Sequence, residues 1–200
     1  GDEGGYAPSV QGGSDEALQV IGKAVGKAGY KLGEDVVLAL DVASSELIEE
    51  GRYNFAREGQ KYTPEQLISK YQKLAEKYPL VSIEDGLAEN DWDGWMQLTE
   101  HLGSKLQLVG DDLLVTNTRL LKRAIDEKAA NAILIKPNQI GTLTETIEAV
   151  RQRISERQLC ARSIGALDSA PSRNGRISGK PWPPRSKPQT TKPWSSWPGM

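Results

Sequence analysis

Four charged side chains follow short apolar segments that have the composition of buried strands. They are Asp41 after VVLAL, Glu84 after LVSI, Asp111 after LQLVG and Lys136 after AILI. Carboxylates that lie close together repel one another unless a cation lies among them. Oxygen ligands without His or Cys favour Mg²⁺, which keeps part of its water shell and takes its remaining ligands from a substrate. The three carboxylates therefore predict a magnesium site with a lysine beside it.

Lys136 is the candidate general base of this site. Burial and a neighbouring cation both lower the pKa of a lysine, and the neutral amine accepts a proton. This chemistry suits proton abstraction next to a carboxylate, with Mg²⁺ stabilising the enediolate that forms. Taken singly, each of these charges also fits a side chain that only reaches for water at a strand end. A further acid, Glu3, lies among the glycines of GDEGGYAP, where a simple glycine-rich turn is the alternative.

Short apolar runs and amphipathic helical patterns predict the elements that must position these side chains. The expected strands are 36–42, 79–85, 106–112 and 131–136. The expected helices are 14–29, 63–78, 90–103, 117–128 and 142–153. Strands that alternate with helices predict a parallel sheet with crossover helices, either a β/α barrel or an open doubly wound sheet. In a barrel the carboxyl ends of the strands meet on one face, where active sites lie. Without a glycine-rich phosphate loop after a strand, dinucleotide binding is disfavoured.

Helix boundaries have their own signals in the sequence. Ser14 and Asn90 are expected N-caps, and Gly103 is expected to close the third helix. Thr63 is the expected cap of the second helix, with proline in the next position and Gln66 completing a capping box.

Composition changes near residue 150. Residues 1–150 carry 15 Lys+Arg and 25 Asp+Glu, whereas residues 151–200 carry 10 and 2. Seven of the 11 prolines also lie after residue 150. We expect this segment to be disordered, with its charge simply solvated. Contact with nucleic acid or an anionic surface, and a shift of reading frame, are the alternatives.

Cysteine content and hydropathy bear on the compartment. A single cysteine, Cys160, excludes an internal disulfide and indicates a reducing compartment. Apolar runs fall short of the ~20 residues that span a bilayer, and a signal peptide is not evident. We therefore expect a cytoplasmic protein without membrane contact.

Five segments carry a family resemblance. GDEGGYAP, LALDVASSE, VSIEDGLAENDWDGW, LVGDDLLVTN and IKPNQIGTLTET follow one another over about residues 1–150. Together they resemble the enolase (phosphopyruvate hydratase) family in its bacterial type. The resemblance implies a partial β/α (TIM-type) barrel over residues 1–153, part of the family's C-terminal barrel domain. Residues 154–200 would then form an unrelated Pro/Ser/Arg/Trp-rich tail.

The resemblance also implies roles for individual residues. Asp41, Glu84 and Asp111 would bind Mg²⁺, and a second Mg²⁺ would arrive with the substrate, 2-phosphoglycerate. Lys136 would take the C2 proton, and Glu3 would assist departure of the C3 hydroxyl to give phosphoenolpyruvate. By strand alternation, Asp85 and Asp112 would point away from the site axis. The family also implies a homodimer.

Parts of the family pattern are not found in these 200 residues. An N-terminal domain and the later strands that end in SHRSGE and IKTG supply further substrate contacts in the family. We therefore expect a fragment without its true N-terminus, with a frameshifted or misassembled coding region after Arg151, that is inactive alone. The alternatives are a non-catalytic fragment whose basic tail or exposed edges bind partners, and a superfamily member that acts on a different carboxylate.

Overall fold

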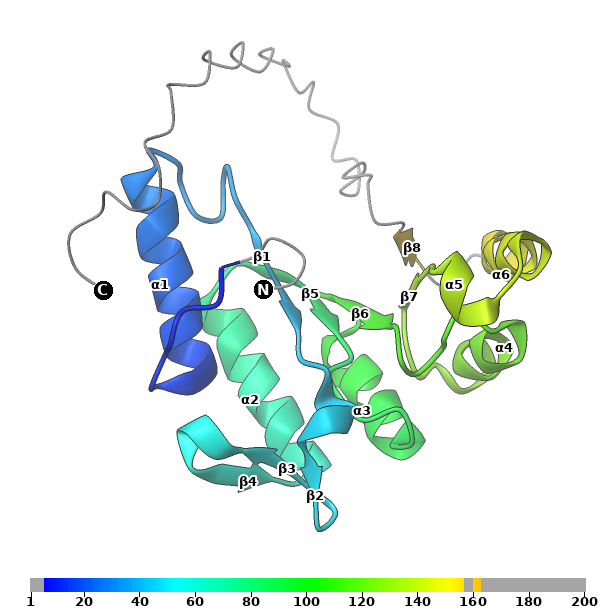
Figure 1. Ribbon diagram of the computed structural model, residues 1–200, viewed down its shortest axis with the longest axis horizontal. Coiled ribbons are helices and arrows are strands. Elements are labelled where there is room, and N and C mark those ends of the chain that lie inside the picture. The colour runs from blue at the N-terminus through cyan, green and yellow to red at the C-terminus, as the bar shows by residue number, and fades with distance from the viewer. Residues whose placement is uncertain (1–5, 157–159, 163–200) are drawn as a thin grey trace, which may run out of the picture. The chain divides into compact units, whose positions relative to one another are not determined.

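The computed structural model describes residues 6–156 and 160–162, and Figure 1 shows the arrangement of their elements. A parallel sheet of five strands runs in the order β1-β5-β6-β7-β8. Its strands are β1 (Leu38–Asp41), β5 (Leu80–Glu84), β6 (Gln107–Gly110), β7 (Ala132–Leu134) and β8 (Cys160–Arg162). The first four lie inside the predicted ranges, and their parallel pairing confirms the predicted partial β/α barrel.

Helices alternate with these strands along the chain. They are α1 (Gly13–Lys27), α2 (Pro64–Lys77), α3 (Trp92–Leu102), α4 (Thr118–Glu127), the short α5 (Pro137–Ile140) and α6 (Leu143–Glu156). Neighbouring helices pack in pairs, α2 against α3 and α4 against α6. Each long helix lies within a few residues of its predicted range, and α5 was not predicted.

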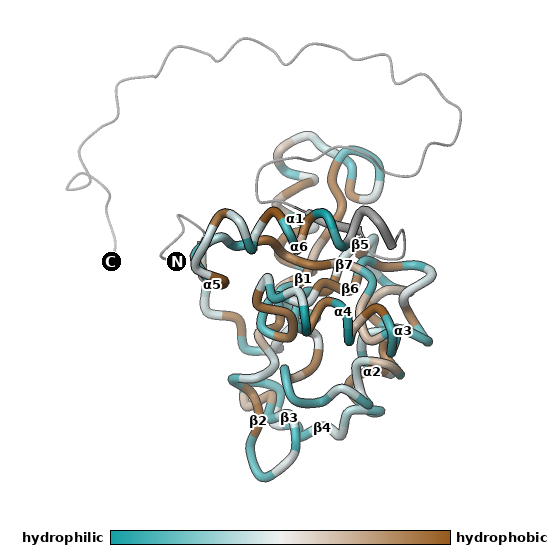
Figure 2. Tube along the Cα trace, turned by 90° about the vertical axis from the view of Figure 1, so that its right-hand side faces the viewer, coloured by the Kyte–Doolittle hydropathy of each residue, from teal (hydrophilic) through white to brown (hydrophobic). Residues whose placement is uncertain are grey.

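The core lies between the sheet and the helices and follows the alternation of the strands. Ile83, Leu108 and Ile133 are fully buried in the main cluster, together with side chains of α2, α3 and α4. A smaller cluster is formed by the neighbouring positions Val109, Ala132 and Leu134. Successive strand residues face opposite sides, so this smaller cluster marks the inner face of the barrel sheet. Figure 2 shows the hydrophobic chain at β6 and β7.

Helix α2 begins as the sequence predicts. The Thr63 hydroxyl accepts from the Gln66 backbone N–H at 3.4 Å, and the Gln66 side chain accepts from the Thr63 N–H at 2.9 Å. Pro64 occupies the first helical position, where its missing N–H costs nothing. The predicted capping box is therefore confirmed.

Two predicted caps are wrong. Helix α1 is capped by Gly12, and Ser14 lies inside the helix, where its backbone N–H and its hydroxyl both donate to Glu58 Oε1 at 3.0 Å. An acceptor from a distant segment thus replaces the local cap. Helix α3 is capped by Asp91 rather than by Asn90, because the Asp91 carboxylate accepts from the Gly94 N–H at 3.0 Å. The predicted C-terminal residue of α3, Gly103, is confirmed.

A small antiparallel sheet between β1 and α2 was not predicted. It consists of β2 (Ile48–Glu49), β3 (Arg52–Phe55) and β4 (Gln60–Tyr62), flanked by the 3₁₀ turns η1 (Ser44–Leu47) and η2 (Ala56–Glu58). The buried Tyr53 anchors it, since its hydroxyl donates to Asp91 Oδ2 at 2.8 Å and accepts from the Ala88 N–H at 3.0 Å. Polar residues dominate these strands, so their hydrophobic pattern is weak.

Two predictions concern residues that the structure does not describe. The predicted acid Glu3 is one of them, and most of the predicted tail, residues 154–200, is the other. The domain boundary between residues 153 and 154 stays a prediction. The structure shows that α6 extends to Glu156 and that β8 pairs with β7 in parallel.

Candidate metal and catalytic site

Neighbouring strands bring the predicted side chains to one edge of the sheet. Asp41 and Glu84 are the last residues of β1 and β5 and pair directly in register. Asp111 follows β6, and Lys136 lies two residues after β7. In β6 and β7, both positions continue the inner-face series of Val109 and of Ala132 and Leu134. The parallel register therefore places the four side chains at the carboxyl edge of the sheet.

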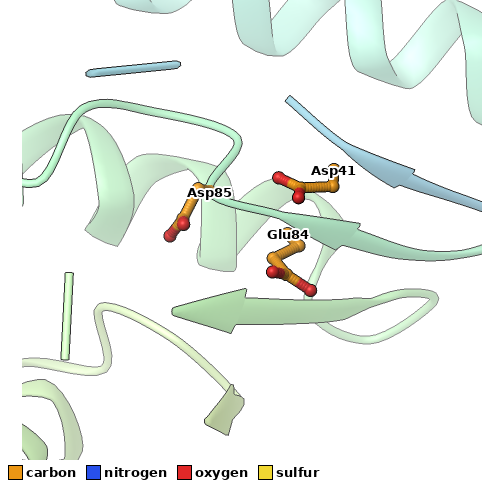
Figure 3. Close-up of side chains that lie close together, drawn as sticks. All are labelled: Asp41, Glu84 and Asp85. Carbon is orange, nitrogen blue, oxygen red and sulfur yellow. The ribbon is translucent and has the colours of Figure 1, made fainter. Parts of the chain in front are cut away.

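Two groups of carboxylates lie at this edge. Asp41, Glu84 and Asp85 each offer an oxygen, and these oxygens lie within 4.8 Å of one another. Figure 3 shows Asp41 and Glu84 near the tips of their strands and Asp85 on the adjoining loop. Asp85 also belongs to a second such group, with Asp111 and Asp112. The structure thus brings Asp41 and Glu84 together and places Asp111 in a neighbouring group, linked through Asp85.

Asp85 does not point away from the site as strand alternation predicts. It lies one residue beyond β5 in the left-handed region, with φ of 42°, so the alternation ends before it. Its buried carboxylate accepts from the backbone N–H groups of Asp111 and Asp112, each at 3.0 Å. Asp85 therefore fixes the backbone that carries Asp111, and the acidic pairs at 84–85 and 111–112 were the available sequence signal.

The carboxyl groups are held in an environment that opposes their ionisation. Burial, followed by the negative charges of Asp41 and Asp111, raises the pKa of Glu84 to about 7. Burial also raises the pKa of Asp41 above its ordinary value. For Asp85, burial outweighs the two backbone hydrogen bonds and raises the pKa to about 6. A cation among these groups would relieve both the repulsion and the cost of burial.

Lys136 makes an ion pair with Asp111. Its side chain is 32% exposed, whereas that of Asp111 is 8% exposed. The hydrogen bond to Asp111 raises the pKa of Lys136, and the charge of Glu84 adds to the effect. This direction is opposite to the predicted decrease, because the prediction assumed a cation among the carboxylates. The negative charges of Asp111 and Glu84 act directly on the Lys136 ammonium.

Two polar residues that the sequence did not single out also contact this pair. The Gln139 amide donates to Asp111 Oδ1 at 2.7 Å. The buried Thr116 hydroxyl accepts from the Lys136 backbone N–H at 2.9 Å. Both residues lie within quoted segments, LVGDDLLVTN and IKPNQIGTLTET, but a Thr or Gln side chain by itself does not indicate a metal-binding or catalytic role.

The donor set fits a hard divalent cation. The two groups consist only of carboxylates, with five different Asp and Glu residues in all. Oxygen-only sites of this kind suit Mg²⁺, whereas Zn²⁺ favours His and Cys ligands. Burial, together with the neighbouring carboxylates, raises the pKa of Glu84 and of Asp85, and a positive charge would offset both effects.

Residues 1–160 match the family model of the enolase C-terminal TIM barrel domain. The chain belongs to the enolase family. The match confirms the family and the β/α barrel that the five sequence segments predicted. Within the enolase family, an acidic edge that could hold a metal ion is consistent with an enolase-type enzyme. The bacterial type of the resemblance stays a prediction.

The length and hydropathy of the helices bear on whether any of them could cross a membrane. Among those that the structure describes, none combines the length and the apolar character needed to cross a bilayer.

Proposed function

We propose that this chain carries the metal-binding and proton-abstracting part of an enolase, which converts 2-phosphoglycerate to phosphoenolpyruvate. The observation that carries the proposal is the ion pair of Lys136 with Asp111 at the same sheet edge as the clustered carboxylates of Asp41 and Glu84. Membership of the enolase family gives this arrangement its most direct interpretation.

In this proposal Asp41, Glu84 and Asp111 hold Mg²⁺. The ion supplies positive charge that offsets the negative charge developing on the substrate carboxylate as the C2 proton leaves. Asp85 keeps Asp111 in place through its backbone hydrogen bonds. All three proposed ligands lie on or directly after strands of the sheet, which makes the site rigid.

The reaction requires one base and one acid. Lys136 Nζ takes the C2 proton, and the electron pair of the C2–H bond becomes the second bond between C2 and C3. The C3–O bond breaks, and Glu3 gives the leaving hydroxyl a proton so that it departs as water. Lys136 must be neutral to accept a proton, whereas its hydrogen bond to Asp111 raises its pKa. A cation held by Asp41, Glu84 and Asp111 would oppose that effect and favour the neutral amine.

Catalysis by the 200-residue chain alone is a separate matter. A complete barrel of this type has eight strands, and the described residues supply five to the parallel sheet. Contacts to the substrate phosphate and carboxylate, which the family motifs SHRSGE and IKTG supply, contribute to transition-state binding. We therefore expect the chain assayed by itself to form no phosphoenolpyruvate.

A graft tests the function directly. Residues 1–153 replace the corresponding segment of a full-length enolase of known activity, and phosphoenolpyruvate formation is followed by its absorbance. Turnover that disappears in the Lys136→Met variant of the graft is the expected result. A folded graft that binds Mg²⁺ but forms no product would contradict the proposal.

Binding of a partner through the basic tail is the second candidate, favoured by the charge change after residue 150. Deletion of residues 155–200 should then abolish retention of the chain on an anionic resin or on single-stranded nucleic acid. Affinity for Mg²⁺ should stay unchanged. Equal retention of both forms would contradict this candidate.

A further inference from the structure

Thr116 and Gln139 lie against the proposed ligand and base without a role in the chemistry described above. Thr116 belongs to the loop between β6 and α4, and Gln139 belongs to α5, directly after Lys136. Thr116 is fully buried and has φ of 55°, in the left-handed region that β-branched residues rarely adopt. Strained positions of this kind persist where the surrounding structure holds them, and they concentrate at functional sites.

Hydrogen bonds join four residues into a closed circuit. The Lys136 backbone N–H donates to Thr116 Oγ1 at 2.9 Å, and Thr116 Oγ1 lies 3.3 Å from Gln139 Oε1. The Gln139 amide donates to Asp111 Oδ1 at 2.7 Å. The second oxygen, Asp111 Oδ2, accepts from the Lys136 ammonium. Each oxygen of the Asp111 carboxylate therefore accepts one hydrogen bond, Oδ1 from Gln139 and Oδ2 from Lys136.

The chemistry of each group fixes the direction of these bonds. Thr116 has one hydroxyl proton, and Gln139 Oε1 at 3.3 Å is a closer acceptor than the Leu134 carbonyl at 3.5 Å. A hydrogen bond to Oε1 turns the amide so that its N–H₂ group faces Asp111. The Thr116 hydroxyl thus orients the Gln139 amide and the Lys136 backbone at the same time.

We propose that Thr116 and Gln139 are positioning residues that hold the Asp111 carboxylate and Lys136 in fixed relation for metal binding. The inference rests on the proposed function, since it assigns Asp111 to the metal. Without Gln139, Asp111 keeps its hydrogen bond from Lys136 but loses the one that sets the rotation of its carboxylate. Loss of such a partner of a metal ligand typically weakens metal binding by about 10- to 100-fold.

Calorimetric titration of Mg²⁺ into the full 200-residue chain tests the proposal. Thr116→Val and Gln139→Leu should each weaken Mg²⁺ binding by about tenfold. Thr116→Ser keeps the hydroxyl and should bind within about twofold of the wild type. In the double variant Thr116→Val/Gln139→Leu the loss should be smaller than the product of the single losses, because both changes break one circuit.

Two matched controls separate this effect from general damage. Thr99→Val removes the hydroxyl of another threonine, whose buried Oγ1 has no hydrogen-bond partner among the described residues. Gln19→Leu removes an amide that donates to a carboxylate, Asp15 Oδ2, at 2.6 Å on exposed α1. Both should bind Mg²⁺ like the wild type. Urea unfolding shows whether each variant is folded. If Thr116→Val does not fold, the Mg²⁺ affinity of Gln139→Leu tests the positioning role.

Amide hydrogen exchange gives a readout that does not depend on metal. The Lys136 amide should exchange about tenfold faster in Thr116→Val than in the wild type or in Thr116→Ser. A wild-type chain that binds no Mg²⁺ overturns the proposed function. Equal exchange of the Lys136 amide in the wild type and in Thr116→Val overturns the positioning of Lys136, whether or not Mg²⁺ binds. Wild-type Mg²⁺ affinity in both Thr116→Val and Gln139→Leu overturns the positioning role, whatever the exchange rates show.

Discussion

At the scale of single residues, the site keeps several carboxylates close together at a cost to the metal-free fold. Burial and neighbouring negative charge raise the pKa of Glu84 to about 7, so ionisation of Glu84 opposes folding. Its folded pKa lies above the unfolded value of 4.5, and stability is therefore lost as the pH rises through the range between them. Groups that weaken the fold in this way are typical of binding and catalytic sites.

Glu84→Gln should stabilise the metal-free chain above pH 7. One pKa unit corresponds to about 1.4 kcal/mol, and partial exposure of Glu84 to water reduces the effect, so we expect a gain of about 1–2 kcal/mol. The same change removes a proposed metal ligand, so added Mg²⁺ should stabilise the variant less than the wild type. Urea unfolding at pH 8 with EDTA and with Mg²⁺ measures both effects.

An exposed glutamate on α3 provides the control for this prediction. Glu100→Gln should change neither the free energy of unfolding nor the response to Mg²⁺ by more than about 0.5 kcal/mol. A Glu84→Gln variant that loses stability in EDTA, or that responds fully to Mg²⁺, would show that the carboxylate has a purely structural role.

At the scale of the elements, most of the fold could be predicted because it follows local signals. Short apolar runs located the four predicted strands, amphipathic periodicity and caps located the five long helices, and the Thr63 capping box marked the start of α2. The position of Ser14 inside α1 could not be predicted, because its acceptor, Glu58, is 44 residues away in the sequence. Charge at the strand ends and the family resemblance indicated Asp41, Glu84, Asp111 and Lys136. Alternation misplaced Asp85, whose left-handed backbone has no sequence signal.

Glu58 joins three elements and should control their stability. Its carboxylate accepts from Ser14 at the start of α1 and pairs with Lys70 of α2, and both charged side chains are largely buried. Burial opposes its ionisation, but the hydrogen bonds from Lys70 and Ser14 outweigh this and hold the pKa of Glu58 below its ordinary value. Glu58→Gln should therefore lower the free energy of unfolding at pH 7 by about 2 kcal/mol.

The pH dependence gives this prediction its sign. A lowered folded pKa means that the contribution of Glu58 is complete above the unfolded value of 4.5 and is lost as the pH falls through the folded pKa. The free energies of unfolding of the wild type and of Glu58→Gln should therefore converge as the pH is lowered from 7 to 3. The exposed pair of Lys122 and Asp126 is the comparison, and Asp126→Asn should cost less than about 0.5 kcal/mol. A difference in the free energy of unfolding between the wild type and Glu58→Gln that stays constant from pH 7 to pH 3 would contradict this role of the Glu58 carboxylate.

At the scale of the whole molecule, the described residues form part of a barrel whose chemistry lies at one edge. Four consecutive strands of the sheet, β1, β5, β6 and β7, each deliver one of the predicted side chains to that edge. Side chains contributed by separate strands are held together only when the sheet is formed, so the site and the fold depend on each other. The enolase family match agrees with this arrangement over residues 1–160.

Loss of deuterium from C2 of labelled 2-phosphoglycerate is the most direct measurement of the central claim, that Lys136 abstracts the C2 proton. It is made with residues 1–153 grafted into a full-length enolase, in the presence of Mg²⁺. We predict that the graft releases the label to solvent and that its Lys136→Met variant releases none above the uncatalysed rate, while still binding Mg²⁺. Release of the label by the Lys136→Met graft at the rate of the unmodified graft would contradict the account.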